Sequence, residues 1–507
     1  MGADTAGPRA HPAVEPPDTG RRRWLQGAAV LASGLAATAP AGAGPRPATQ
    51  GDGDGEVLDV LIIGAGLAGL TAARDLHRAG NRRFLVLEAR DRVGGRTLNH
   101  QLRDGQISEA GGQWIGPGQT AVADLARELE IGTFKSDYRG RGVYCMGQGR
   151  VVEDTHGQVD MDPTLVAEVD ALARSLRPVR PWAAPEAAAL DKLSMADWLA
   201  RRHVSEQDML TWQFASVLTM GTSLAQVSLL QYLSLIRYAG GFQTLEGQKD
   251  AAQETRFIGG SQRLSIRMAE ALKDFVRLKT PVTRIAHWDQ PVTEVHTPQG
   301  VFRARRVIVA LSPSLCHRLA FEPALPADRQ RLQRLWPTHG PFAKTAMVYP
   351  EPFWFAKGYN GQIGCVDGPV IWSYDNSPPD QRLGVINAFV RIGEMPGDPA
   401  AARQRLATIY AEAMQDKRFL APLEFHLQDW GQEPYTLSCV SPMAPGFLTS
   451  GLMPALTRNL GSLIWSGTET ADLWYGYMDG AVRSGHTAAL VALQALQSRL
   501  AGREVSA

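Results

Sequence analysis

The segment at residues 59–97, DVLIIGAGLAGLTAARDLHRAGNRRFLVLEARDRVGGRT, constrains the fold of this chain more than any other stretch. An apolar run rich in β-branched residues at 60–63 leads into glycines in the pattern G-x-G-x-x-G, which opens a helical pattern. A second apolar run at 84–87 ends in an acidic residue, Glu88. A strand, a glycine turn, a helix, a strand and an acid in this order predict a βαβ unit that binds a dinucleotide.

Each glycine of this pattern has its own expected role. Gly64 permits the tight turn after the strand, and Gly66 lets backbone N–H groups approach a pyrophosphate. Gly69 lets the helix pack closely against the strand. The N-terminus of the helix attracts the charge of the phosphates. Glu88 can then accept hydrogen bonds from a ribose diol.

Length, composition and charge narrow the class of protein. The chain has 507 residues, of which 44% are hydrophobic, and its formal net charge is +1. The length predicts two or more domains, and the composition is typical of a globular protein. A charge this small gives no indication of a nucleic acid as a partner. The four cysteines are widely spaced, which matches neither a zinc site nor a dense disulfide framework, so we expect no metal.

The N-terminus has the pattern of an export signal. Arginines at 21–23 precede a mildly apolar segment and then the small residues at 41–43. The apolar segment is too short to span a bilayer, so residues 1–43 are predicted to be a signal peptide and residues 44–55 a linker. The arginine pair resembles a twin-arginine signal, which exports folded proteins. We therefore expect a periplasmic or extracellular protein without a membrane span.

The rest of the chain alternates between helical and strand-like patterns. Residues 160–250 look mostly helical, because apolar residues recur there at helical spacing. Short apolar runs between 257 and 313, one of them at 307–311, predict a return to strands. A terminal helix is expected over about 478–496. The pattern predicts an α/β fold with two domains, each assembled from non-contiguous segments.

Four motifs together resemble the flavin-contact segments of the flavin-dependent amine oxidases, the family of monoamine oxidases and polyamine oxidases. They are EARDRVGGRT at 88–97, EAGGQW at 109–114, FIGGS at 257–261 and WSGTETADLWYGYMDGA at 465–481. They occur in the family's order, and the similarity extends from about residue 56 to 495.

The resemblance implies FAD rather than NAD as the cofactor. It implies a Rossmann-like FAD-binding domain made of three separated segments, with an α+β substrate domain over the flavin ring. The expected FAD-binding segments are 56–140, 255–313 and 436–495, the expected substrate segments are 141–254 and 314–435, and a tail follows at 496–507.

Several further residues match positions that contact FAD in the family. Arg90 and Arg96 could supply cationic donors, and Val282 matches a position whose backbone reads the adenine. Glu469 matches a position near the ribityl chain and the N-terminus of the terminal helix. Cys439 falls where mitochondrial monoamine oxidases carry the cysteine bonded to the flavin 8α-methyl group. Covalent attachment through Cys439 and non-covalent binding both remain open.

The resemblance also implies the residues that handle the substrate. Lys344 stands where the family has a lysine hydrogen-bonded through water to the flavin N5, and Trp430 aligns with a tryptophan that packs beside the flavin. Tyr477 aligns with one wall of an aromatic cage that orients the amine. The second wall falls at Val440, an aliphatic residue that should accept a different substrate shape. Tyr238 aligns near a pocket-lining position.

The implied reaction is the oxidative deamination of a primary, or secondary, amine to an aldehyde through an imine. A small-molecule amine and O2 are the expected partners, with hydrogen peroxide and ammonia as products; a homodimer is left open. Because the flavin carries the hard chemistry, the protein is expected to supply orientation and a dry site.

Other functions remain alternatives at this stage. A polyamine or putrescine oxidase would favour acidic residues at the pocket mouth, and three are available but unplaced: Asp367, Asp375 and Glu246. An L-amino-acid oxidase requires an arginine clamp, which no motif identifies. An amine dehydrogenase would pass electrons to a cytochrome instead of O2. A structural flavin protein is disfavoured, because it needs neither Lys344 nor an open amine face.

Overall fold

The computed structural model describes residues 56–504 apart from 147–148, 154–156, 158, 339–341 and 438–439. The expected signal peptide, the linker and Cys439 lie outside the described residues. The described residues form one unit by their contacts, so the boundaries expected between FAD-binding and substrate segments stay a prediction.

The glycine-rich segment forms the βαβ unit that its sequence predicts. β1 (Val57–Ile63) leads through the glycine turn into α2 (Leu67–Arg78), and β2 (Phe84–Leu87) runs parallel to β1. Ile63 pairs with Leu87, so the glycine turn and Glu88 follow the ends of two adjacent strands. Both strands are buried along most of their length, which is why they read as continuous apolar runs.

Strands from distant parts of the chain extend this unit into an eight-stranded sheet. Their order is β13-β10-β11-β12-β1-β2-β9, and β19 pairs with β12. The added strands are β9 (Val276–Arg277), β10 (Arg284–Ala286), β11 (Thr293–Thr297), β12 (Gly300–Val309), β13 (Ala320–Glu322) and β19 (Leu463–Trp465). β12 starts earlier than the run at 307–311 predicted, because its first part forms an antiparallel hairpin with β11. β13 lies beyond residue 313, where it pairs in parallel with β10.

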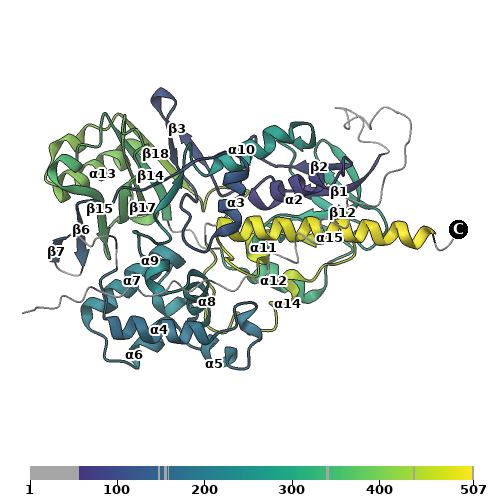
Figure 1. Cartoon of the computed structure of the whole chain (residues 1–507), viewed down its shortest axis with the longest axis horizontal. Helices are drawn as coiled ribbons and strands as arrows, with labels where there is room; N and C mark the ends of the chain where they lie inside the picture. Colours follow the sequence, from purple (N-terminus) through teal and green to yellow (C-terminus); the bar gives the residue numbers. More distant parts are fainter. Residues whose placement is uncertain are drawn as a thin grey trace, which may run out of the picture. The chain divides into compact units, whose positions relative to one another are not determined.

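Helices from both ends of the chain cover this sheet. α15 (Met478–Glu504) lies beside α2, as Figure 1 shows, and is longer than the predicted terminal helix. A Cβ atom on Gly485 would lie 2.4 Å from the Ala68 carbonyl oxygen, so the two helices approach this closely only because a glycine stands there. Their apolar side chains share one core with α3 (Thr120–Glu128) and α10 (Gln262–Ala271).

A second sheet has seven strands in the order β18-β14-β17-β16-β15-β6-β7. They are β6 (Arg141–Met146), β7 (Gly149–Glu153), β14 (Phe342–Tyr349), β15 (Tyr359–Cys365), β16 (Val370–Asp375), β17 (Gly384–Arg391) and β18 (Glu424–Asp429). All neighbours are antiparallel except β6 and β15. Side chains of α13 (Pro399–Ala413) pack against its apolar face.

A helical layer occupies the segment that the sequence predicts to be helical. It contains α4 (Pro163–Ser175), α5 (Ala187–Asp191), α6 (Met195–Ala200), α7 (Glu206–Met220), α8 (Leu229–Ala239) and α9 (Phe242–Glu246), and Figure 1 shows these helices grouped together. α8 is buried along almost its whole length and forms the centre of the layer. Leu332 of α12 (Ala327–Leu335) and Ala455 of α14 (Pro454–Thr457) join the same core.

Short elements connect these layers. They are the ladder of β3 (Asn99–Gln101) with β4 (Ile107–Glu109), the ladder of β5 (Thr133–Lys135) with β8 (Thr255–Phe257), and α11 (Pro313–Cys316). Arg256 of β8 donates to Glu109 of β4 at 2.7 and 3.0 Å, and both side chains are buried. Both N–H groups donate to Glu109 Oε2, and this ion pair joins two segments that are far apart in the sequence.

The described residues show neither a membrane-spanning helix nor a metal-binding cluster. Within them, the structure contains no helix with the length and apolar character that a membrane span requires. The same residues include no cluster of three or more His, Cys, Asp or Glu side chains that could hold a metal ion.

Candidate active site

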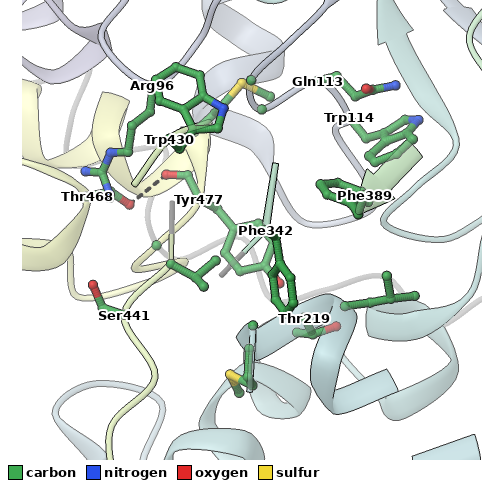
Figure 2. Close-up of a pocket in the computed structure, with 18 of the residues that line it drawn as sticks. Arg96, Gln113, Trp114, Thr219, Phe342, Phe389, Trp430, Ser441, Thr468 and Tyr477 are labelled. Carbon is green, nitrogen blue, oxygen red and sulfur yellow. Dashed lines mark hydrogen bonds between the residues drawn. The ribbon is translucent and has the colours of Figure 1, made fainter. Parts of the chain in front are cut away.

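A cavity of about 520 Å³ lies where both sheets and the helical layer meet. This volume is in the range of about 300–1,000 Å³ that small-molecule sites occupy. The lining combines the glycine turn after β1, side chains of β14 and β17, and residues of α7 and α8, some of which Figure 2 shows. Most residues predicted from the sequence line it: Gly64, Gly66, Glu88, Arg90, Arg96, Lys344, Trp430, Val440, Glu469 and Tyr477.

The glycine turn forms one end of the cavity. Gly64 has a φ of +104°, a backbone conformation that favours glycine. A Cβ atom on Gly69 would lie 1.9 Å from the Gly64 carbonyl oxygen, which is the close helix–strand packing expected of this position. A Cβ atom on Gly66 would find only the Gly95 Cα, at 3.9 Å. The space above Gly66 is therefore open to the cavity.

Glu88 is buried at the end of β2 and faces the glycine turn. Its carboxylate accepts hydrogen bonds from the backbone N–H groups of Ala65, at 2.8 Å, and Arg90, at 3.0 Å. A carboxylate has about four lone-pair sites, so it can also accept from a ribose diol. Arg90 is held in place, because its guanidinium donates to Glu433 and Thr436.

Glu469 is buried in the short helical turn at Thr468–Thr470. Its Oε1 lies 2.8 Å from Arg96 Nη2, yet the contact lacks hydrogen-bond geometry, and neither carboxylate oxygen has a hydrogen-bond partner among the described residues. A buried acceptor without a donor is costly and points to a missing partner. The hydroxyl groups of a bound dinucleotide are suitable donors.

These residues fit an FAD molecule. The open space at Gly66 suits a pyrophosphate, Glu88 suits a ribose, and the bare oxygens of Glu469 suit hydroxyl groups of the ribityl chain. Val282 does not line the cavity; its side chain packs with apolar residues of the first sheet. Its expected role rests on the backbone and stays a prediction.

Lys344 enters the cavity from β14. Its Nζ donates to the Gly111 carbonyl at 2.9 Å and to Gln113 Oε1, and the side chain is buried. Three aromatic rings surround the ammonium group at 5.6–5.8 Å: Trp114, Tyr374 and Phe389. Ring faces attract a cation, so this lysine stays in a fixed position at the cavity wall.

Trp430 and Tyr477 line the same cavity. The Trp430 indole N–H donates to the Ala110 carbonyl at 2.8 Å, which fixes the ring plane. Tyr477 precedes α15, its ring packs edge-on against Trp474, and its backbone carbonyl accepts from the Thr468 hydroxyl at 2.7 Å (Figure 2). Burial raises the pKa of Tyr477, and the charge of Glu246 raises it further by a smaller amount. The phenol therefore stays protonated at neutral pH.

The aromatic lining differs from the expected cage. Val440 lines the cavity, as predicted, but Tyr238 does not. The Tyr238 ring packs edge-on against Tyr475, and it is Tyr475 that contributes to the lining. The prediction for Tyr238 was wrong because its position on α8 directs the side chain toward Tyr475, in the segment before α15, and not into the cavity.

Several lining residues were missed from the sequence. Phe342 and Phe389 lie on the neighbouring strands β14 and β17 and line the cavity, but no sequence motif marks them. Of the three acids available for a polyamine, only Glu246 lines this cavity; Asp367 is exposed and Asp375 is buried beside Ser377. No sequence signal separates Glu246 from the other two.

The fold narrows the class of protein before any comparison. Two parallel strands, β1 and β2, present a glycine turn and an acid at adjacent ends to a cavity, which is the arrangement of a Rossmann-type, dinucleotide-dependent oxidoreductase.

The particular family follows from comparison with known proteins. A family model described as flavin containing amine oxidoreductase matches residues 67–493, and the chain belongs to this family. It is an FAD-dependent enzyme that deaminates amines oxidatively.

Individual proteins of similar sequence or structure are also flavin-dependent or amine-oxidising enzymes by name. AofH of Mycobacterium tuberculosis, whose name describes a flavin-containing monoamine oxidase, is 36% identical over 85% of this chain and 96% of its own length. Cyclohexylamine oxidase from Brevibacterium oxydans has a similar structure, with a TM-score of 0.79, 31% identity, and coverage of 87% of this chain and 100% of that one. Putrescine oxidase bound to putrescine has a TM-score of 0.78, 30% identity, and coverage of 87% and 99%.

Proposed function

We propose that this enzyme oxidises a primary amine to an imine, which water hydrolyses to an aldehyde and ammonia, with O2 as the electron acceptor and hydrogen peroxide as the second product. The observation that carries this proposal is the placement of Lys344, Trp430 and Tyr477 around the cavity that also contains the FAD-fitting residues. Bound FAD supplies the chemistry that removes a hydride equivalent from the carbon next to the amine.

The side chains act by position and by exclusion of water. Tyr477 presents a π face that attracts and orients an amine, and Trp430 gives a rigid wall. Lys344 is held at the wall by Gly111 and Gln113, and we assign its ammonium group to the reaction with O2, in which negative charge develops on oxygen. The amine must be neutral to react, so kcat/KM should rise with pH until the substrate has lost its proton.

An L-amino-acid substrate has less support than an amine. The cations among the described lining residues are Arg90, Arg96 and Lys344. Arg90 and Arg96 contact Glu433 and Glu469, at the dinucleotide end, and Lys344 is bonded to Gly111 and Gln113. No arginine among the described lining residues is therefore available to clamp a substrate carboxylate.

The acceptor is proposed to be O2 on the names of the relatives, since both structural relatives are oxidases. A cytochrome as acceptor would leave turnover slow without that partner and peroxide absent. Export to the periplasm or beyond is proposed on the sequence alone, through the twin-arginine-type pattern at residues 1–43. A homodimer is compatible with this function but nothing in the site requires one.

One experiment tests the proposed reaction. The purified holoenzyme is mixed anaerobically with a panel of monoamines, diamines and L-amino acids while flavin bleaching is recorded. Air is then readmitted and peroxide is assayed. We expect bleaching by amines and stoichiometric peroxide on reoxidation. A flavin that no amine bleaches would overturn the reaction, and bleaching without peroxide would overturn O2 as the acceptor.

A further inference from the structure

A carboxylate faces the cavity from the helical layer. Glu246 is the last residue of α9, and it is half-buried and lines the same cavity as Tyr477. The surrounding lining belongs to α7 and α8, so this part of the cavity is built by the layer opposite the glycine turn. The proposed reaction gives Glu246 no role.

Two hydroxyl groups hold this carboxylate in place. Thr219 Oγ1 donates to Oε2 at 2.6 Å, and Tyr232 Oη donates to Oε1 at 2.7 Å. Each oxygen keeps a lone pair for a further donor. Among the described residues, no lysine or arginine forms an ion pair with Glu246. An anchored, unpaired carboxylate in a cavity is a receptor for a cation.

The electrostatics of the cavity support this assignment. Burial raises the pKa of Glu246 to about 7, against the lowering effect of its two hydrogen bonds. An incoming cation would favour the ionised form and so bind to a group that is ready to lose its proton. The charge of Glu246 also raises the pKa of Tyr477, which means that the two groups lie within electrostatic reach of each other.

The lining residues at the dinucleotide end carry charges of both signs, because Glu88 and Glu469 accompany the cations there. Arg90, Arg96 and Lys344 contact the residues around the dinucleotide end and the Gly111 loop. Glu153 and Asp160 join Glu246 among the lining residues on the side of β7 and the helical layer. A cavity region lined by acids concentrates cationic ligands.

We propose that Glu246, oriented by Thr219 and Tyr232, binds a second positively charged group of the substrate, and that the preferred substrates are diamines or polyamines. The reacting amino group is neutral and lies at Tyr477, while the distal ammonium group binds the Glu246 carboxylate. This inference rests on the proposed function and specifies the substrate class. A charge-assisted contact of this kind is also directional, so it selects the chain length between the two amino groups.

The test compares an α,ω-diaminoalkane with the 1-aminoalkane of equal chain length, across a series of lengths. In the wild-type holoenzyme, kcat/KM for the best diamine should exceed that of its matched monoamine by roughly 10- to 100-fold, the usual worth of one charged hydrogen bond. Glu246→Gln keeps the shape and should remove that preference while leaving the monoamine within about twofold. Thr219→Val should reduce the preference by less.

The controls separate this inference from the function on which it rests. Glu153→Gln removes another acid from the same lining and should change the ratio of the two substrates far less than Glu246→Gln. Flavin bleaching by the monoamine shows that each variant is folded and active. Equal losses for both substrates in Glu246→Gln, or a wild type without diamine preference, would overturn the subsite. A wild type that neither substrate bleaches would instead overturn the proposed function.

Discussion

Replacing Gly66 with alanine separates cofactor binding from folding. Gly66 has φ −79° and ψ −179°, which alanine adopts without strain, and the new Cβ atom would meet only the Gly95 Cα, at 3.9 Å. The methyl group would, however, project into the space that suits the pyrophosphate. The variant should therefore fold, but it should bind FAD much more weakly.

The magnitudes follow from this geometry. In the apoprotein, the reduced entropy of the unfolded chain favours alanine by about 0.4–1 kcal/mol, and the weaker helix cap opposes it by a similar amount. The unfolding free energy should thus change by less than about 1 kcal/mol. A methyl group in the place of a phosphate should weaken FAD binding at least about 100-fold, which is about 2.7 kcal/mol. The stabilisation that bound FAD adds to the folded protein should fall by the same amount.

The assay measures FAD binding by absorbance and flavin fluorescence, and apoprotein unfolding in urea. Gly69→Ala is the matched control, because its Cβ atom would lie 1.9 Å from the Gly64 carbonyl oxygen and backbone cannot move aside cheaply. That variant should lose about 2–3 kcal/mol of apoprotein stability as well as FAD. The reasoning is refuted if Gly66→Ala binds FAD within tenfold of wild type, or unfolds as early as Gly69→Ala.

Three further results are expected. Lys344→Met should slow the return of flavin colour in air by roughly 100-fold, because the ammonium group at the cavity wall is lost. Anaerobic bleaching by the amine should stay near wild type. Equal losses of rate in stopped-flow traces of flavin reduction and flavin reoxidation would contradict this. Arg256→Met should lower the free energy of unfolding in urea by about 3–5 kcal/mol, because it leaves the buried Glu109 carboxylate without its cation. Arg127→Met, which removes an exposed ion pair, should leave the urea midpoint nearly unchanged. Similar shifts of the midpoint in both variants would refute the argument. If Cys439 binds FAD covalently, the yellow colour should stay with acid-precipitated protein; colour wholly in the supernatant excludes the bond.

Much of the site was predictable where function depends on a short stretch of chain. The roles of Gly64 and Gly69 depend on a turn and on the first turn of a helix, so the spacing of the glycines was enough to predict them. Lys344 required the resemblance, because every residue of β14 after the first is buried and no alternation marks a face. Tyr238 was assigned to the wrong surface, since the rotation of a buried helix depends on its neighbours.

The sequence by itself determined the βαβ unit, the dinucleotide cradle and, through motifs in a fixed order, FAD and an amine as the partners of this chain. These features are local, because each depends on residues that are neighbours along the chain. Only the tertiary structure decided which of three acids lines the cavity. Glu246 reaches the cavity because α9 packs where Thr219 of α7 and Tyr232 of α8 meet its carboxylate. Contacts between separate helices leave no periodic trace in the sequence, and so the position of this acid could not be predicted from the sequence.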